Sequence, residues 1–280
     1  MVSYESNDAF ACQINSSFIE IILCVINRTS FKKSYTMIPK IIHYCWLSDD
    51  AMPDLVLRCI NSWKEKLPDY ELILWDKKRF DLESLTWTKQ AYDAKKYAFA
   101  ADYIRLYSVY TYGGIYLDTD VEVLKSFDTL LHLPYFMGWE FNDRLMEAAT
   151  FGAEAGCKWL GDCLRYYEGR EFFLPNGTMD MKVLPLIMKE LIKSNYKIYS
   201  LYNLPESYKD NGFYLFPKDY FSPKSCYSRK VRITANTYSI HHFNATWMSP
   251  AFRFFMYVKH ILYKIGVMLL GHNWRTMNRT

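Results

Sequence analysis

The segment 113–120, Gly-Gly-Ile-Tyr-Leu-Asp-Thr-Asp, constrains this chain more than any other part of its sequence. It runs from a glycine pair through an apolar, strand-like stretch to two aspartates spaced i, i+2. Side chains two apart on an extended segment point to the same face, so Asp118 and Asp120 are expected to aim at one point beyond a strand end. Two carboxylates held that close repel each other unless a cation lies beside them. Hard cations such as Mg²⁺ take one or two carboxylates together with phosphate oxygens, so the segment predicts a metal site that binds a diphosphate.

The flanking residues favour this interpretation over an ordinary turn, in which Asp side chains bond to their own backbone. A glycine pair permits close backbone packing or a positive φ. Apolar residues on both sides of the acidic triplet predict two short buried strands, namely Ile115, Leu117, Val121 and Val123. A charged pair between buried strands is costly unless it has a partner, which supports a bound cation.

The order of the predicted elements indicates an α/β sheet. Strands are expected at 38–47, 70–75, 114–117, 121–124, 135–141, 148–152 and 237–241. Helices are expected at 52–67, 97–112, 158–169 and 179–194, and residues 201–228 are expected to be more irregular. The chain of 280 residues, half of them apolar, fits one large domain with small additions. We expect residues 1–36 to be an appendage or a docked helix, residues 37–250 to be the main domain, and residues 251–280 to be a separate segment.

The charge is distributed unevenly along the chain. From residue 220 to the end there is no Asp or Glu but there are nine Lys and Arg, whereas the remainder carries 25 basic and 30 acidic residues. A basic tail of this kind predicts an anionic partner. Three cations interrupt the apolar, aromatic run 251–270, which favours an amphipathic helix on an anionic membrane surface over a bilayer span. A helix packed on the domain with snorkelling Lys and Arg is the alternative, and nucleic acid is not expected as a partner.

The cysteines predict a reducing compartment. Seven are present, an odd number, and no two form a Cys-x-x-Cys pair. Most lie in apolar runs, as buried free thiols do. We therefore expect neither a disulfide framework nor a structural zinc site, and a cytoplasmic location.

One predicted helix and the acidic segment that follows it carry a family resemblance. Asp102 and Arg105 lie at i, i+3, a spacing for which a simple surface salt bridge is the ordinary explanation. Here they lead directly into the glycine pair and the Asp-x-Asp triplet, and the strings 38–46, 63–76 and 241–247 match in the same order. In these features the chain resembles the sugar transferases with an Asp-x-Asp motif, which include capsular-polysaccharide enzymes and fungal outer-chain mannosyltransferases. It is similar, more distantly, to the large glucosylating toxins of bacteria.

This resemblance implies a GT-A fold, in which a Rossmann-like mixed sheet is flanked by helices. It also implies a retaining transfer of a hexose from a nucleotide-diphosphate sugar, with Mn²⁺ or Mg²⁺ as cofactor. The implied acceptor is a glycan or a lipid-linked oligosaccharide in surface-polysaccharide synthesis. The implied place of work is the inner face of the bacterial cell membrane.

The resemblance also implies roles for individual residues in donor binding. Asp102 and Arg105 would hold hydroxyl groups of the donor sugar. Asp120 would ligate the metal directly, and Asp118 would contact ribose and sugar or bind the metal through water. Trp46 would stack on the nucleotide base, although a tryptophan in the core fits the sequence almost as well.

Three further residues complete the implied site. Tyr116 would belong to the donor site. His241 or His242 would lie near the diphosphate, and His242 is the histidine that we assign to the metal. Trp247 would donate its indole N–H to a phosphate oxygen.

The chain departs from the family pattern at two places. Ser48-Asp49 stands where relatives often carry Gly-Gly, and Lys77-Lys78 stands where relatives often carry Asn. These departures leave the base and ribose contacts open, and with them the alternative of a non-catalytic glycan- or lipid-binding protein that retains the fold. A metal-dependent phosphotransferase or nuclease is a third possibility, although the chain has no P-loop-type glycine-rich segment. Glu140 is a minor candidate for a covalent nucleophile.

Overall fold

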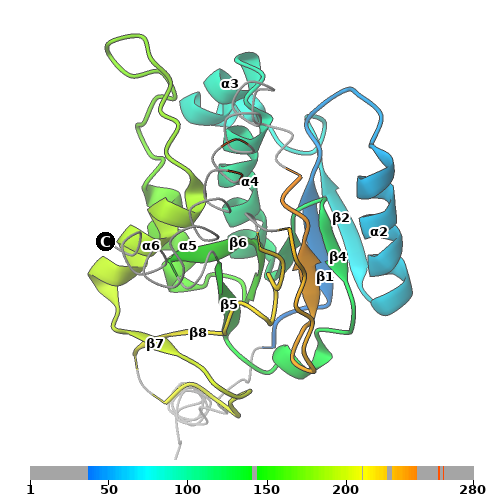
Figure 1. Cartoon of the computed structure of the whole chain (residues 1–280). Coiled ribbons are helices and arrows are strands. Elements are labelled where there is room, and N and C mark those ends of the chain that lie inside the picture. The colour runs from blue at the N-terminus through cyan, green and yellow to red at the C-terminus, as the bar shows by residue number, and fades with distance from the viewer. Residues whose placement is uncertain are drawn as a thin grey trace, which may run out of the picture. The chain divides into compact units, whose positions relative to one another are not determined.

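Figure 1 shows the computed structural model of the chain, which describes residues 37–140, 144–209, 211–225, 229–244, 258 and 261. The chain divides into two compact units, Met1–Thr36 and Met37–Thr280. All described residues lie in the second unit. The expected appendage 1–36 and nearly all of the expected tail 251–280 therefore lie outside the described residues, and the roles assigned to them stay predictions.

A five-stranded mixed sheet forms the centre of the second unit, in the order β2-β1-β3-β6-β5. Strand β1 (Ile41–Cys45) pairs in parallel with β2 (Glu71–Trp75) and with β3 (Gly114–Leu117). Strand β6 (Leu145–Ala153) pairs antiparallel with β3 and with β5 (Tyr135–Glu140). The predicted α/β class, with a mixed sheet flanked by helices, is confirmed.

Helices supply the crossovers that parallel strands need. Helix α2 (Asp54–Lys66) connects β1 to β2, and α4 (Tyr97–Tyr112) leads into β3. The other helical segments are η1 (Leu82–Ser84), α3 (Thr86–Asp93), η2 (Asp128–Leu130), α5 (Lys158–Arg165) and α6 (Leu184–Asn195). In Figure 1, α2 lies on one side of the β1–β2 pair, and α4, α5 and α6 lie on the other. Among the described residues, no helix combines the length and the apolar character that a bilayer crossing requires.

Two small ribbons flank the main sheet. Strand β4 (Val121–Val123) pairs antiparallel with β9 (Ser239–His241), which brings the end of the described chain back to the acidic segment. Strand β7 (Ile198–Ser200) pairs in parallel with β8 (Phe213–Leu215). The first of these ribbons matters for function, because it places residues 241–244 beside Asp120.

Alternation along β3 divides the apolar residues into two cores. Ile115 and Leu117 belong to the core that contains Trp63 of α2, whereas Tyr116 belongs to the core under α4. All three β3 residues are buried, as expected of a strand covered on both faces. Residue 118, two positions after Tyr116, therefore begins on the α4 side of the sheet.

The structure differs from the expected elements in two instructive places. Helix α6 begins at Leu184 rather than near residue 179, because Met179 pairs with Phe173 in an antiparallel bridge and Pro185 stands in the first helical turn. Strand β6 is longer than the expected 148–152 and includes Glu147, a charged residue that the sequence pattern placed outside the strand.

The glycine pair provides both a positive φ and close backbone packing, the two properties that the sequence suggested. Gly113 ends α4 with a φ of 67°, and Gly114 opens β3 with a φ of 107°. A Cβ atom on Gly114 would lie 2.7 Å from the backbone oxygen of Ile41, closer than real Cβ contacts. The pair therefore permits both the left-handed turn and the close approach of β3 to β1.

We predict that Gly114→Ala costs more stability than Gly177→Ala. Both glycines have a positive φ, so both substitutions carry backbone strain of about 1–3 kcal/mol. Only Gly114 also meets backbone, since nothing lies within 4 Å of a Cβ on Gly177. Urea unfolding of the two variants should show an additional loss of about 1–3 kcal/mol for Gly114→Ala. Equal losses would show that the approach of β3 to β1 is not tight.

A buried neutral histidine joins β1 to its neighbours. The indole N–H of Trp75 donates to Nδ1 of His43 at 3.0 Å, so Nδ1 carries no proton. Nε2 lies 2.8 Å from the carbonyl oxygen of Gly113, which only accepts, so Nε2 donates. Burial lowers the pKa of His43 to about 4, with a smaller contribution from Arg79. His43 is therefore neutral in the folded protein throughout the physiological range.

We predict that His43 makes the protein less stable as the pH falls from 7.5 to 4.5. In the unfolded chain His43 takes a proton below about pH 6.5, whereas the folded state does so only near pH 4, so acid favours unfolding. At pH 4.5, protonation of His43 in the unfolded chain lowers the free energy of unfolding by roughly 2–3 kcal/mol. His43→Gln offers the same acceptor and donor but does not titrate. Urea midpoints at the two pH values should fall further for the wild type than for this variant, and parallel falls would contradict the assignment.

Candidate functional site

The Asp-x-Asp segment forms a tight turn where β3 ends. The backbone N–H of Asp118 donates to the carbonyl oxygen of Ala149 on β6 at 2.9 Å, and the N–H of Val121 donates to the carbonyl oxygen of Asp118. The Tyr116 hydroxyl donates to the Asp118 carboxylate at 2.9 Å. Asp118 and Asp120 converge as predicted, but a turn anchored on β6 brings them together rather than a continuous extended strand.

Arg105 lies buried beneath this turn, between the two predicted partners on α4 and β3. Its guanidinium lies 3.2 Å from Asp118 and 3.3 Å from Asp102, and it donates to the carbonyl oxygen of Ala148 at 2.9 Å. Its charge also lies 4.8 Å from the centroid of the Tyr116 ring, a cation–π contact. The predicted residues Asp102, Arg105, Tyr116 and Asp118 therefore form one connected cluster.

Burial governs the charges of this cluster. Burial raises the pKa of Asp102 to about 7, although Arg105 acts in the opposite direction. Burial also raises the pKa of Asp118, while Arg105 again opposes the shift. Asp118 is the carboxylate with the stronger set of partners, because it has both the guanidinium and the Tyr116 hydroxyl. A second cation beside Asp118 would favour its ionised form further.

Asp120 is held by the returning end of the chain. The N–H of His242 donates to the backbone oxygen of Asp120 at 3.0 Å, and the N–H of Asn244 donates to its carboxylate at 2.8 Å. These bonds continue the β4–β9 ribbon past its last ladder pair. The Asp120 carboxylate is thereby fixed in place while its charge stays available to a ligand.

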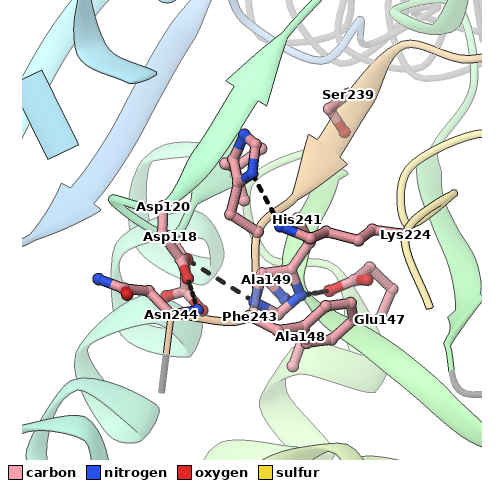
Figure 2. Close-up of polar contacts among 12 residues, drawn as sticks. Asp118, Asp120, Glu147, Ala148, Ala149, Lys224, Ser239, His241, Phe243 and Asn244 are labelled. Atoms are coloured by element: carbon pink, nitrogen blue, oxygen red, sulfur yellow. Dashed lines mark hydrogen bonds and ion pairs between the residues drawn. The ribbon is translucent and has the colours of Figure 1, made fainter. Parts of the chain in front are cut away.

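His241 lies between two carboxylates, as Figure 2 shows. Its Nε2 is 3.7 Å from Asp120, and its Nδ1 is 3.5 Å from Glu147. The ring also lies 4.0 Å, centroid to centroid, from Phe243, whose backbone has a φ of 52°. Burial by itself would lower the pKa of His241, but Asp120, Glu147 and Glu140 outweigh it and raise the pKa to about 10.

The structure revises the assignment of His242 to the metal. His242 lies 2.8 Å from the carboxylate of Glu122 and 3.2 Å from the amine of Lys224, outside the Asp118–Asp120 cluster. His241, the last residue of β9, is the histidine whose ring lies within reach of Asp118 and Asp120.

The remaining predicted residues lie apart from this cluster. Trp46 follows the end of β1, is half-buried against the α2 core, and donates its indole N–H to the backbone oxygen of Asp50 at 3.0 Å. It lies where β1 ends, and β1 and β3 are parallel neighbours, so both chains leave the sheet at the same edge. Trp247 lies outside the described residues.

Two glutamates beside His241 complete the site. Glu147 of β6 is fully buried, and Glu140 lies at the end of β5. Burial, with Glu147 second, raises the pKa of Glu140 to about 8. A carboxyl group that is mostly protonated at neutral pH is a poor nucleophile, which weighs against the minor role suggested for Glu140. The one sequence signal that could have revealed Glu147 is a charge within an otherwise apolar strand.

The donor set fits a divalent cation. Asp118, Asp120 and His241 place ligand atoms within 4.8 Å of one another. His241 Nδ1 and a carboxylate oxygen of Glu147, on the far side of the ring from the aspartates, are buried without a hydrogen bond among the described residues. Two carboxylates with one imidazole are compatible with Mn²⁺, which accepts oxygen ligands.

Comparison with known proteins finds sequence relatives of the segment that contains the two aspartates. Residues 53–137 match the family model described as glycosyltransferase sugar-binding region containing DXD motif. The chain is 35% identical over 114 residues to inositol phosphoceramide mannosyltransferase 3 of Schizosaccharomyces pombe (strain 972 / ATCC 24843). That alignment covers 39% of this chain and 32% of the relative, so the chain spans about a third of the length of the relative it matches.

Solved structures show only a distant likeness. The PaToxG glycosyltransferase aligns with a TM-score of 0.43 at 18% identity, over 64% of this chain and 76% of that one. A second structure, of a transferase mutant, aligns with a TM-score of 0.37 at 9% identity, over 56% of this chain and 86% of that one.

The match to the family model includes the whole cluster around Arg105, together with Asp120. Asp102, Arg105, Tyr116, Asp118 and Asp120 all lie within it. The resemblance stated from the sequence is therefore confirmed where it was strongest. Residues 53–137 of this chain are therefore similar to the glycosyltransferase sugar-binding regions that contain a DXD motif.

Proposed function

We propose that the chain is a metal-dependent, retaining glycosyltransferase that moves a hexose from a nucleotide-diphosphate sugar to a lipid-linked glycan in surface-polysaccharide synthesis. The observation that carries the proposal is the convergence of Asp118, Asp120 and His241 in and beside the matched region. The relative is named as a mannosyltransferase for inositol phosphoceramide, which supports a hexose donor and a lipid-linked acceptor.

The cation would be held by Asp118, Asp120 and His241. When bound, it would neutralise the negative charge that develops on the departing diphosphate. The aspartates are preorganised for this by the Ala149, Asn244 and Arg105 contacts, so little reorganisation is needed during the reaction. Mn²⁺ is our specific proposal for the ion.

Arg105 and Asp102 would bind the donor sugar through its hydroxyl groups. Arg105 contacts Asp102, Asp118 and the Ala148 carbonyl oxygen. These three contacts fix the orientation of the guanidinium, and therefore the direction in which its other N–H groups can donate. Trp46 would stack on the base from the end of β1. The sugar becomes oxocarbenium-like in the transition state. In the retaining reaction the bond to the diphosphate would break, and the acceptor hydroxyl would attack from the leaving-group face and give its proton to the departing phosphate.

The departures from the family pattern also favour a second candidate, a non-catalytic glycan- or lipid-binding protein. Lys77 forms an ion pair with Asp49 at 2.6 Å, so the two departing positions contact each other. Calorimetry separates the two functions. Affinity for glycan or lipid without affinity for any nucleotide sugar would favour the binding protein.

We predict that Asp120→Asn and His241→Gln abolish transfer. Asparagine keeps an acceptor for the Asn244 N–H, so the substitution removes charge with little change in geometry. We expect a loss on the order of 10²-fold or more, since the charge on the leaving group is no longer neutralised. The assay measures nucleotide release from a panel of nucleotide-diphosphate sugars with Mn²⁺.

Matched controls lie close to these residues in the sequence. Glu122→Gln and His242→Gln alter the 2.8 Å pair outside the cluster, and we expect their activity to stay close to that of the wild type. Full activity of Asp120→Asn, or equal losses in His241→Gln and His242→Gln, would contradict the assignment. Absence of turnover with every donor would reject the transferase proposal.

We propose further that the chain acts in the cytoplasm, peripherally on the inner face of a bacterial cell membrane. The support is the absence of acidic residues after residue 220, together with the basic, aromatic run 251–270.

We predict that removing residues 251–280 abolishes binding to anionic liposomes. The run contains cations within an apolar stretch, so binding should also weaken as salt is raised. Co-sedimentation with vesicles of phosphatidylcholine and phosphatidylglycerol measures both effects. If the truncated chain still sediments with the vesicles as the full chain does, the membrane role of this segment is refuted.

A further inference from the structure

Three consecutive residues of β6 contact three different parts of the site. The Glu147 carboxylate lies beside His241, the Ala148 carbonyl oxygen accepts from Arg105, and the Ala149 carbonyl oxygen accepts from the Asp118 N–H. The Ala149 N–H in turn donates to Glu147 at 2.8 Å. Of the three contacts to the site, two use the backbone of β6, and only the contact to His241 depends on a particular side chain.

The position of Glu147 is costly for a carboxylate. The residue is fully buried in a strand whose other members are almost all apolar. One carboxylate oxygen accepts from Ala149, and the other has no hydrogen bond among the described residues. Burying a charge without full compensation is unfavourable, so a residue of this kind usually has a specific partner. The imidazole of His241 is the group of opposite character that faces it.

His241 is constrained on three sides. Glu147 faces Nδ1 at 3.5 Å, Asp120 faces Nε2 at 3.7 Å, and Phe243 covers one face of the ring. Because Glu147 faces Nδ1, the ring is oriented with Nε2 directed at the aspartates. Histidines that bind metals are commonly oriented in this way by a carboxylate behind them.

We propose that Glu147 is a positioning residue that orients His241, so that Nε2 is presented to the cation held with Asp118 and Asp120. The proposal rests on the function proposed above for the cation itself. It assigns a role to a residue that is remote in sequence from both the acidic segment and the histidine pair, and that lies outside the matched region.

The first test is Mn²⁺ affinity, measured by electron paramagnetic resonance of free Mn²⁺ titrated into the full chain. We expect Glu147→Gln to weaken binding about 10–100-fold, the usual effect of removing such a partner. Glu147→Asp keeps the charge at a shorter reach and should recover part of the affinity. Thr150→Val is the matched control, because Thr150 is also buried on β6 and its hydroxyl has no hydrogen bond among the described residues.

The second test needs no metal. Nitrogen NMR of the histidine rings reports which ring nitrogen carries the proton, and the His241 signals are assigned by their loss in His241→Gln. We expect Glu147→Gln to shift the His241 signals, and Thr150→Val to leave them unchanged. This measurement responds to the contact between the two side chains rather than to overall stability.

The two tests separate the possible failures. Unchanged His241 signals in Glu147→Gln would overturn the positioning role, and so would wild-type Mn²⁺ affinity in that variant. Equal loss of affinity in Glu147→Gln and Thr150→Val would show that the effect is general destabilisation and would also overturn it. If the wild type does not bind Mn²⁺ while Glu147→Gln still shifts the His241 signals, Glu147 positions His241 and the metal-dependent function fails instead.

Discussion

The buried guanidinium of Arg105 is the interaction on which the site depends. A buried cation is tolerated only when carboxylates and hydrogen bonds compensate its lost hydration. Asp102 comes from the same helix, Asp118 from the end of β3, and the Ala148 carbonyl oxygen from β6, so one charge joins three elements. Loss of any partner would leave a charge or a polar group unpaired in the interior. The elements therefore cannot move independently of one another.

Much of the fold could be predicted because its sequence signals are local. The helix before the glycine pair and strand β3 were predicted with the bounds that the structure has, since a glycine with positive φ marks where one ends and the other begins. The cluster of Asp102, Arg105 and Asp118 was also predictable, because its members lie within 17 residues of the chain. Helix α6 was predicted too early, because its expected first turn is used by the bridge between Phe173 and Met179.

The identity of the histidine was not predictable, for a physical reason. His241 is the last residue of β9 and His242 follows it, and the two rings have different partners. The turn that contains Asp118 and Asp120 departs from strand geometry, so strand alternation alone does not give the histidine that meets the aspartates. His241 stands opposite Val121, whereas His242 shares a face with Glu122. The pairing of residues as distant in sequence as Val121 and His241 leaves no mark in a single sequence. Glu147 was missed because a carboxylate in an apolar run suggests the end of a strand, whereas β6 continues through it.

The antiparallel pairing of β4 with β9 has a consequence for synthesis of the chain. Residues 53–137 emerge from the ribosome with both aspartates but without the imidazole, the Asn244 amide or Glu147. Under the proposed function, a half-made polypeptide would hold an incomplete set of ligands. Assembly of the full constellation would wait until β9 pairs with β4, which would couple binding of the proposed cation to a late step in folding.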